Sequence, residues 1–220
     1  MGPILSVLLL VIGAASAMAQ NPGSPPRVRL EDHRPPLFFR EDWKEIPPVT
    51  PVTPEHLTNP KLQLALYGPG KDGVRKSHHD TPKDDPYYIW SGECAGNCAI
   101  ALRDKESYVD LTGLAKIRWR TKQSGFRELH LILKLRDGTW LVGDHAEGAT
   151  ADWRETEFAI ADVHWRRLDI KTIVESAWVE KPDLSKVDEI GWTDLMVGGD
   201  SPASSRVDWI EVYGNPVRRE

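Results

Sequence analysis

YVDLTGLAKIRWRTKQSGFRELHLILKLRDGTWLVGD, residues 108–144, is the stretch of the chain that decides the fold. It contains three runs in which apolar and polar residues alternate, and a period of two is typical of strands with one face on a core. Leucines occupy every second position of 129–135, and His130 and Lys134 lie between them. Asp137-Gly138 predicts a tight hairpin after this run. We therefore expect one sheet here, with an apolar face and a face that carries cations and a histidine.

The rest of the chain continues the strand pattern. Further runs of strand character lie at residues 37–46, 61–68, 98–105, 156–160 and 205–214. Helical periodicity is almost absent, although Thr53-Pro54-Glu55 is suited to cap a single helical turn. About eight or nine short strands at regular spacing predict an all-β fold, an antiparallel β-sandwich of jelly-roll type.

The N-terminal residues indicate export. An apolar run is followed by Ala17-Met18-Ala19, which predicts a signal peptide over residues 1–19 that is cleaved after Ala19. An uncleaved anchor is the alternative, but the apolar run is too short to span a membrane. Residues 20–36 are rich in proline and predict a flexible leader, and 37–220 suffice for a single β-sandwich domain. We expect a secreted or periplasmic protein without a membrane span.

Charge and cysteine content narrow the class of partner. The net charge is −5 with both signs well mixed, which argues against nucleic-acid binding. Cys94 and Cys98 are the only cysteines. In an oxidising compartment they are expected to form a local disulfide. Two free thiols are the alternative, and a zinc site is a more distant one.

Four segments carry a resemblance to a known family. They are YVDLTGLAKIRWRTKQ (108–123), DWRETEFAIADV (152–163), LSKVDEIGWTDLM (184–196) and SRVDWIEVYG (205–214). Their order and spacing resemble the galactose-binding-like jelly rolls of carbohydrate-binding modules and complex I intermediate-associated proteins. The resemblance covers about residues 98–213. It implies a concave sheet face that holds sugar, and a structural calcium near the closing strand with Asp208 as a ligand.

The polar face of the central strands is the first candidate site. Sugar recognition combines an aromatic platform with several hydrogen-bonding groups, and guanidinium groups suit acidic sugars. The candidates for ligand binding are Arg118, Arg120, His130, Lys134, Trp140, Asp144 and Trp90. The alternative is a solvated outer face on which nearby acids balance the cations. Of the other tryptophans, Trp153 and Trp178 are further candidate platforms, whereas Trp119 and Trp209 are expected in the core.

Histidines and carboxylates form the second set of candidates. A long loop holds His78, His79 and Asp80, which with His130 or His145 are suited to bind a metal or to act as a general base. Solvated loop histidines are the alternative. The candidates for an acid/base pair are Asp144, Glu147, Asp194 and Asp200. Motifs for a nucleophilic serine, a zinc protease, a P-loop or a dinucleotide site do not occur.

These features favour a secreted protein that binds a polysaccharide or oligosaccharide, with an acidic or plant-derived glycan expected. The alternative is a secreted glycoside hydrolase or polysaccharide lyase that uses His78, His79 or His130 with a carboxylate such as Asp144, with or without a metal. A periplasmic scaffold is a third hypothesis.

Overall fold

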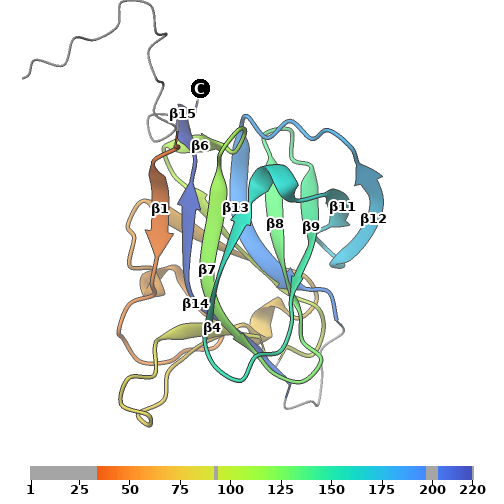
Figure 1. Ribbon diagram of the computed structural model, residues 1–220. Coiled ribbons are helices and arrows are strands. Elements are labelled where there is room, and N and C mark those ends of the chain that lie inside the picture. Colours follow the sequence, from red (N-terminus) through yellow and green to blue (C-terminus); the bar gives the residue numbers. More distant parts are fainter. Residues whose placement is uncertain (1–33, 92–93, 197–202, 220) are drawn as a thin grey trace, which may run out of the picture. The chain divides into compact units, whose positions relative to one another are not determined.

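Two antiparallel sheets pack face to face in the computed structural model (Figure 1), which describes residues 34–91, 94–196 and 203–219. The expected all-β sandwich of jelly-roll type is therefore confirmed. The expected signal peptide and most of the expected leader lie outside the described residues. Within the described part, no helix is long and apolar enough to cross a membrane.

The first sheet, called sheet A here, is built around β14. Its strands run in the order β10-β7-β14-β4-β3, and β1 pairs with β14 beside β4. The strands are β1 (Leu37–Glu41), β3 (Arg75–Ser77), β4 (Tyr88–Trp90), β7 (Lys116–Gln123), β10 (Arg154–Ala159) and β14 (Ser205–Tyr213).

The second sheet, sheet B, runs in the order β12-β11-β9-β8-β13-β5-β2, and β6 joins β13 to β15. Its strands are β2 (Leu62–Tyr67), β5 (Ala99–Asp104), β6 (Ser107–Asp110), β8 (Leu129–Leu135), β9 (Trp140–Glu147), β11 (Trp165–Asp169), β12 (Val174–Val179), β13 (Val187–Asp194) and β15 (Asn215–Arg218). Three short 3-10 turns complete the fold: η2 (Pro54–His56), η3 (Lys71–Gly73) and η4 (Ile160–Asp162). η2 is the helical turn expected after Thr53.

The core lies between the sheets and follows the predicted alternation. On β7, Ile117 and Trp119 are fully buried, and on β8 all four leucines, at every second position, belong to the same cluster. Trp43 and Trp192 meet edge to face across this core, with ring centroids 6.0 Å apart. Each large apolar side chain buried here contributes about 1.5–3 kcal/mol to folding.

The hairpin between β8 and β9 forms where the sequence predicts it. The backbone N–H of Thr139 donates to Oδ1 of Asp137 at 2.9 Å, and Gly138 takes a φ of +87°, which a residue with a Cβ rarely adopts. However, β7 lies in sheet A, whereas β8 and β9 lie in sheet B. The expectation that residues 108–144 form one sheet is therefore wrong, because alternation shows which side of a strand is apolar but not which partner it pairs with.

An irregularity in β14 changes the orientation of Trp209. The register with β7 shifts between Val207 and Trp209, so that Trp209 lies opposite Arg120 on the outer face. Trp119 lies in the core between the sheets as expected, and Trp209 is buried as expected, although on the outer side of sheet A rather than between the sheets. Trp209 is only 7% exposed because arginine side chains cover it from outside.

Candidate ligand-binding site

The residues expected on one polar face are divided between the two outer faces of the sandwich. Arg118 and Arg120 project from β7 of sheet A, whereas the other predicted members of the central cluster lie on β8 and β9 of sheet B: His130, Lys134, Trp140 and Asp144. The predicted cluster is therefore not a single site.

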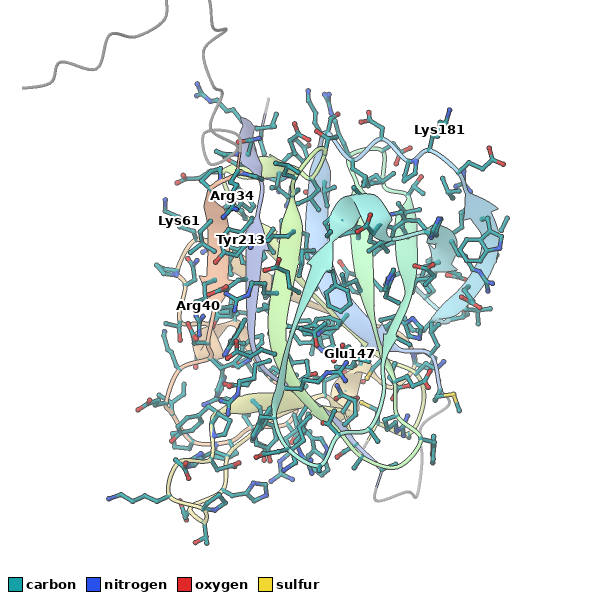
Figure 2. All side chains as sticks on the ribbon, viewed as in Figure 1. Arg34, Arg40, Lys61, Glu147, Lys181 and Tyr213 are labelled. Atoms are coloured by element: carbon teal, nitrogen blue, oxygen red, sulfur yellow. The ribbon has the colours of Figure 1, made fainter. Side chains whose placement is uncertain are left out.

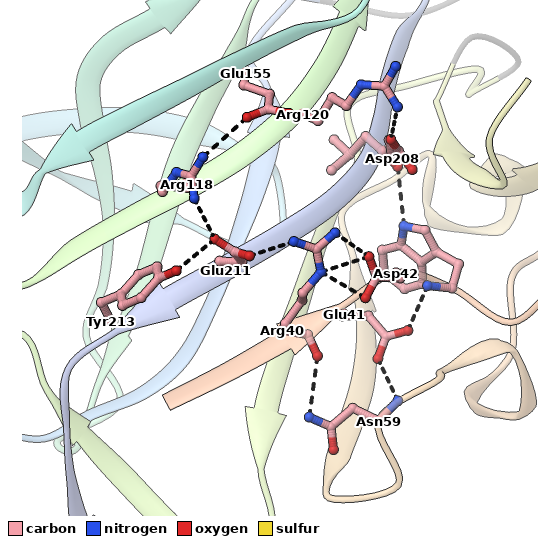
Figure 3. Close-up of polar contacts among 12 residues, drawn as sticks. Arg40, Glu41, Asp42, Asn59, Arg118, Arg120, Glu155, Asp208, Glu211 and Tyr213 are labelled. Atoms are coloured by element: carbon pink, nitrogen blue, oxygen red, sulfur yellow. Dashed lines mark hydrogen bonds and ion pairs between the residues drawn. The ribbon is translucent and has the colours of Figure 1, made fainter. Parts of the chain in front are cut away.

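On sheet A the cations are neutralised by acids on neighbouring strands (Figure 3). Arg118 is 3.1 Å from both Glu211 and Glu155, and Arg120 donates to Asp208 at 2.7 Å. Glu211 also accepts from Arg40 at 2.5 Å. These contacts match the alternative of a solvated face with balanced charges.

The aromatic rings on this face are covered by the same kind of cation. Arg40 lies 4.5 Å above the ring of Trp209. Arg120 lies 5.4 Å from the ring centre of Trp153, and Lys116 lies 5.0 Å from that of Tyr213. Trp90 is half-buried, with Arg75 at 5.8 Å. Sheet A thus presents rings that are already stacked, rather than an open platform.

Asp208, the residue that the resemblance links to calcium, lies within this charged layer. Burial raises its pKa to about 6, although the hydrogen bond from Arg120 opposes the change. The nearest partner of this carboxylate is itself a cation, Arg120. Among the residues that the structure describes, no group of three or more His, Cys, Asp or Glu side chains could hold a metal. The structural calcium stays an untested prediction.

The loop histidines lie close to sheet A, away from His130. His78 stacks on Tyr87 with ring centroids 4.2 Å apart. His79 Nδ1 is 2.9 Å from Asp85 and 3.0 Å from the hydroxyl of Tyr88. His78 borders a hollow of about 800 Å³ whose lining includes Asp42, Asp84, Asp85 and Asp208. The structure therefore does not bring the loop histidines together with His130 and Asp144.

One half of the outer face of sheet B is closed. Glu189 is buried and accepts hydrogen bonds from Tyr67 and Lys134, each at 2.7 Å. Trp140 packs edge to face on Tyr67 and is 7% exposed, within a small apolar cluster that includes Ile132 and Ile173. The expectation that Trp140 is an exposed platform is wrong. Lys134 belongs to this closed network.

The other half of this face is open. A pocket of about 310 Å³ lies over parts of β8, β9, β11 and β12. Its polar and aromatic lining consists of Glu128, His130, Asp144, Arg166, Glu175 and Trp178. Three residues that the sequence had singled out, namely His130, Asp144 and Trp178, thus come together. We call this hollow the first pocket.

Trp178 is the feature that distinguishes the first pocket. All nine tryptophans lie within the described residues, and Trp178 alone is exposed, at 54%. The guanidinium of Arg166 lies 4.1 Å from its ring centre and donates to Glu175 at 2.5 Å. One face of the indole is therefore held by a cation, and the ring is fixed in position at the edge of the pocket.

Hydrogen bonds to neighbouring groups determine the tautomer of neutral His130 and lower the pKa of Asp144. His130 Nδ1 is 3.0 Å from the carbonyl oxygen of Gly143, which only accepts, so Nδ1 carries the hydrogen and neutral His130 has its lone pair on Nε2. Asp144 accepts from His145 at 2.9 Å and from the backbone and side chain of His164 at 3.0 and 3.1 Å. Burial raises the pKa of Asp144, but these hydrogen bonds outweigh it and hold the pKa below its usual range.

Two structural supports around the first pocket were not predicted from the sequence. Asn97 donates through Nδ2 to the carbonyls of Leu195 at 3.1 Å and Ile173 at 3.4 Å. It thereby joins the segment after β13 to the β11–β12 hairpin. Arg127 and Asp194 form a buried ion pair at 3.1 Å, and Asp194 also accepts from the backbone of Met196. Asp194 was expected in an acid/base pair rather than as a support, and no local motif marks Asn97 or Arg127, because their partners are distant in sequence.

The remaining candidates have structural partners. Glu147 is buried and pairs with Arg154 at 2.6 Å, and Asp194 pairs with Arg127. Asp200 lies outside the described residues. The buried sulfurs of Cys94 and Cys98 are 2.9 Å apart, and the hydrogen bond between them and burial raise the pKa of Cys98. The expected disulfide stays a prediction.

Known proteins share this architecture at low similarity. The family 11 carbohydrate-binding module of the cellulase Lic26A-Cel5E of Clostridium thermocellum aligns with a TM-score of 0.45 and 13% identity, over 78% of this chain and 96% of that one. The family 11 module from Clostridium thermocellum in complex with a β-1,3-1,4-mixed-linked tetrasaccharide gives 0.44 and 14%, over 80% and 100%. An exo-β-agarase gives 0.41 and 10%, over 74% of this chain and 24% of that one. Neither protein-family models nor curated proteins match the chain. At these TM-scores the likeness carries no functional conclusion.

Proposed function

We propose that this protein is exported and binds a neutral oligosaccharide or polysaccharide in the first pocket. The observation that carries the proposal is Trp178, an exposed indole bordering a pocket whose other polar groups are carboxylates, a histidine and an arginine. A sugar ring has an apolar C–H face that stacks on an indole and hydroxyl groups that donate to carboxylates. Asp144 and Glu128 supply such acceptors.

The charge of the pocket favours a neutral ligand. Three carboxylates, those of Glu128, Asp144 and Glu175, face one guanidinium, which already pairs with Glu175. A uronic acid would add a further negative charge at close range, which is unfavourable. The acidic ligand expected from Arg118 and Arg120 is therefore not the one proposed here, because both of these residues are engaged on the other face.

Retention in polysaccharide-containing gels tests this proposal. Trp178→Ala should lose most of the retention by neutral polysaccharides, whereas Trp153→Ala, which changes a tryptophan beside sheet A, should keep it. Circular dichroism of both variants checks that they are folded. Wild-type retention by Trp178→Ala, or stronger retention by polyuronates than by neutral polysaccharides, would contradict the proposal.

A second candidate is glycoside hydrolysis in the same pocket. It is favoured by the free lone pair on Nε2 of His130 and by the carboxylates that share the pocket, since hydrolysis needs an acid and a base on either side of the scissile bond. Incubation with a panel of neutral glycans, followed by an assay for new reducing ends, distinguishes it from binding alone. Product that disappears in His130→Gln or Asp144→Asn would favour the enzyme.

A further inference from the structure

We infer that the binding site continues past Trp178 into a second pocket, so that the ligand is a chain of several sugar units. This inference rests on the proposed function. The second pocket measures about 540 Å³ and lies between η4, the start of β11 and the end of β12. Its lining is mostly apolar and includes Val163, Trp165 and Leu184.

The two pockets share their boundary. Trp178 lines both of them. His164 lines the second pocket and donates twice to Asp144, which lines the first. The pockets are therefore separated by one indole ring and one histidine–carboxylate contact, so a ligand that fills the first pocket reaches the second by passing over Trp178.

Arg166 belongs to the first pocket alone. It lies 4.1 Å from the ring centre of Trp178 and lines the first pocket, but not the second. A sugar unit in the second pocket therefore meets Trp178 away from this cation, while its neighbour in the sugar chain meets the carboxylates of the first pocket.

The position of β12 at the edge of sheet B leaves room for a sugar chain to pass. Among the described strands, β12 pairs with β11 alone and forms the edge of sheet B, as Figure 1 shows. Lys181, labelled in Figure 2, lies just beyond the end of β12, where the polypeptide turns away from the sheet. Each pocket is within the size range of small-ligand sites, and a ligand that occupies both requires more than one ring.

The test is the dependence of affinity on chain length. Isothermal titration would use neutral β-1,4-glucan, β-1,3-glucan and β-1,4-mannan oligosaccharides of increasing length, from the disaccharide to the hexasaccharide. For the series that binds, we expect the wild-type Kd to fall by about tenfold or more as the chain lengthens. Equal affinity at every length would overturn the inference and leave the proposed function intact. The absence of binding at any length, together with loss of gel retention, would overturn both.

A matched pair of variants locates the effect. Ala161 is exposed on η4 and lines the second pocket, so Ala161→Trp should fill that pocket without reaching the first. Its affinity for long chains should drop to that of short ones, with short chains unaffected. Ala177→Trp, an exposed position on β12 that lines neither pocket, should behave as the wild type. Unchanged length dependence in a folded Ala161→Trp would refute the second pocket. The wild-type length series stands independently of how this variant folds.

Discussion

Asp208 should make the stability of this protein fall as the pH rises through the weakly acidic range. Its side chain is 9% exposed, and burial raises its pKa from 3.8 to about 6 in the folded state, despite the contact with Arg120 at 2.7 Å. Between about pH 4 and pH 6, the folded protein therefore keeps a proton that the unfolded chain has released. Raising the pH across this interval lowers the free energy of unfolding.

The magnitude follows from the two pKa values. A rise from 3.8 to about 6 corresponds to about 3 kcal/mol, which is fully present below about pH 4 and is lost above the folded-state pKa. Asp208→Asn removes the ionisation while keeping the shape of the side chain. Relative to the wild type, the variant should gain about 3 kcal/mol between pH 4 and pH 7.

Urea denaturation followed by tryptophan fluorescence, at several pH values over this range, measures the difference between the two proteins. Carboxylates with lowered pKa, such as Asp144, titrate in both proteins and cancel in the difference. Asp152→Asn is the matched control, because Asp152 is 86% exposed and lies 3.8 Å from Lys122 on the same face, and it should change stability by less than about 0.5 kcal/mol. A difference between Asp208→Asn and the wild type that is constant with pH would refute the reasoning. A difference that grows in favour of the wild type would show that the attraction of Arg120 outweighs burial.

Three further predictions concern the two supports of the first pocket and the cysteine pair. Asn97→Ala removes two hydrogen bonds and should lower the free energy of unfolding, measured by urea denaturation, by about 1–3 kcal/mol. It should also weaken ligand binding in the first pocket. Unchanged ligand affinity would show that Asn97 does not position the two segments that it joins. Arg127→Met leaves Asp194 buried without its cation and should lower the free energy of unfolding by about 3–5 kcal/mol. A loss below about 1 kcal/mol would contradict a stabilising role for this ion pair. Protein recovered from an oxidising compartment should contain a Cys94–Cys98 disulfide, so that thiol labelling after denaturation modifies neither cysteine without prior reduction; two labelled cysteines would contradict it.

Alternation in the sequence identified which side chains point outward, but not which sheet carries them. The leucines of β8, the hairpin at Asp137 and the core position of Trp119 all follow from local pattern. The separation of β7 from β8 depends on pairing between strands that are far apart in sequence, which no local pattern encodes. The orientation of Trp209 depends on a bulge next to Asp208, and a single extra residue reverses every later side chain.

The same limitation applied to the candidate site. Trp178, His130 and Asp144 were recognisable as residue types suited to binding, but their common location was not. It arises because β11 pairs with both β9 and β12, which places Arg166 opposite Val142 on one side and opposite Trp178 on the other. Arg166 and Glu175 become candidates only once this register is known.

The contrast between the two outer faces explains why binding is assigned to sheet B. On sheet A, a ligand would have to displace Arg40 from Trp209, or Arg118 from its two glutamates, before it gained any contact. Truncating or displacing one partner leaves the other charge without compensation, which is costly when the acid is as buried as Glu211 or Asp208. On sheet B, the exposed indole of Trp178 and the exposed side of Asp144 meet solvent already, so a sugar replaces water without breaking an ion pair. The number of cations on a strand is therefore a poor guide to a binding face, and a carboxylate that still reaches solvent beside an exposed ring, as Asp144 does beside Trp178, is a better one.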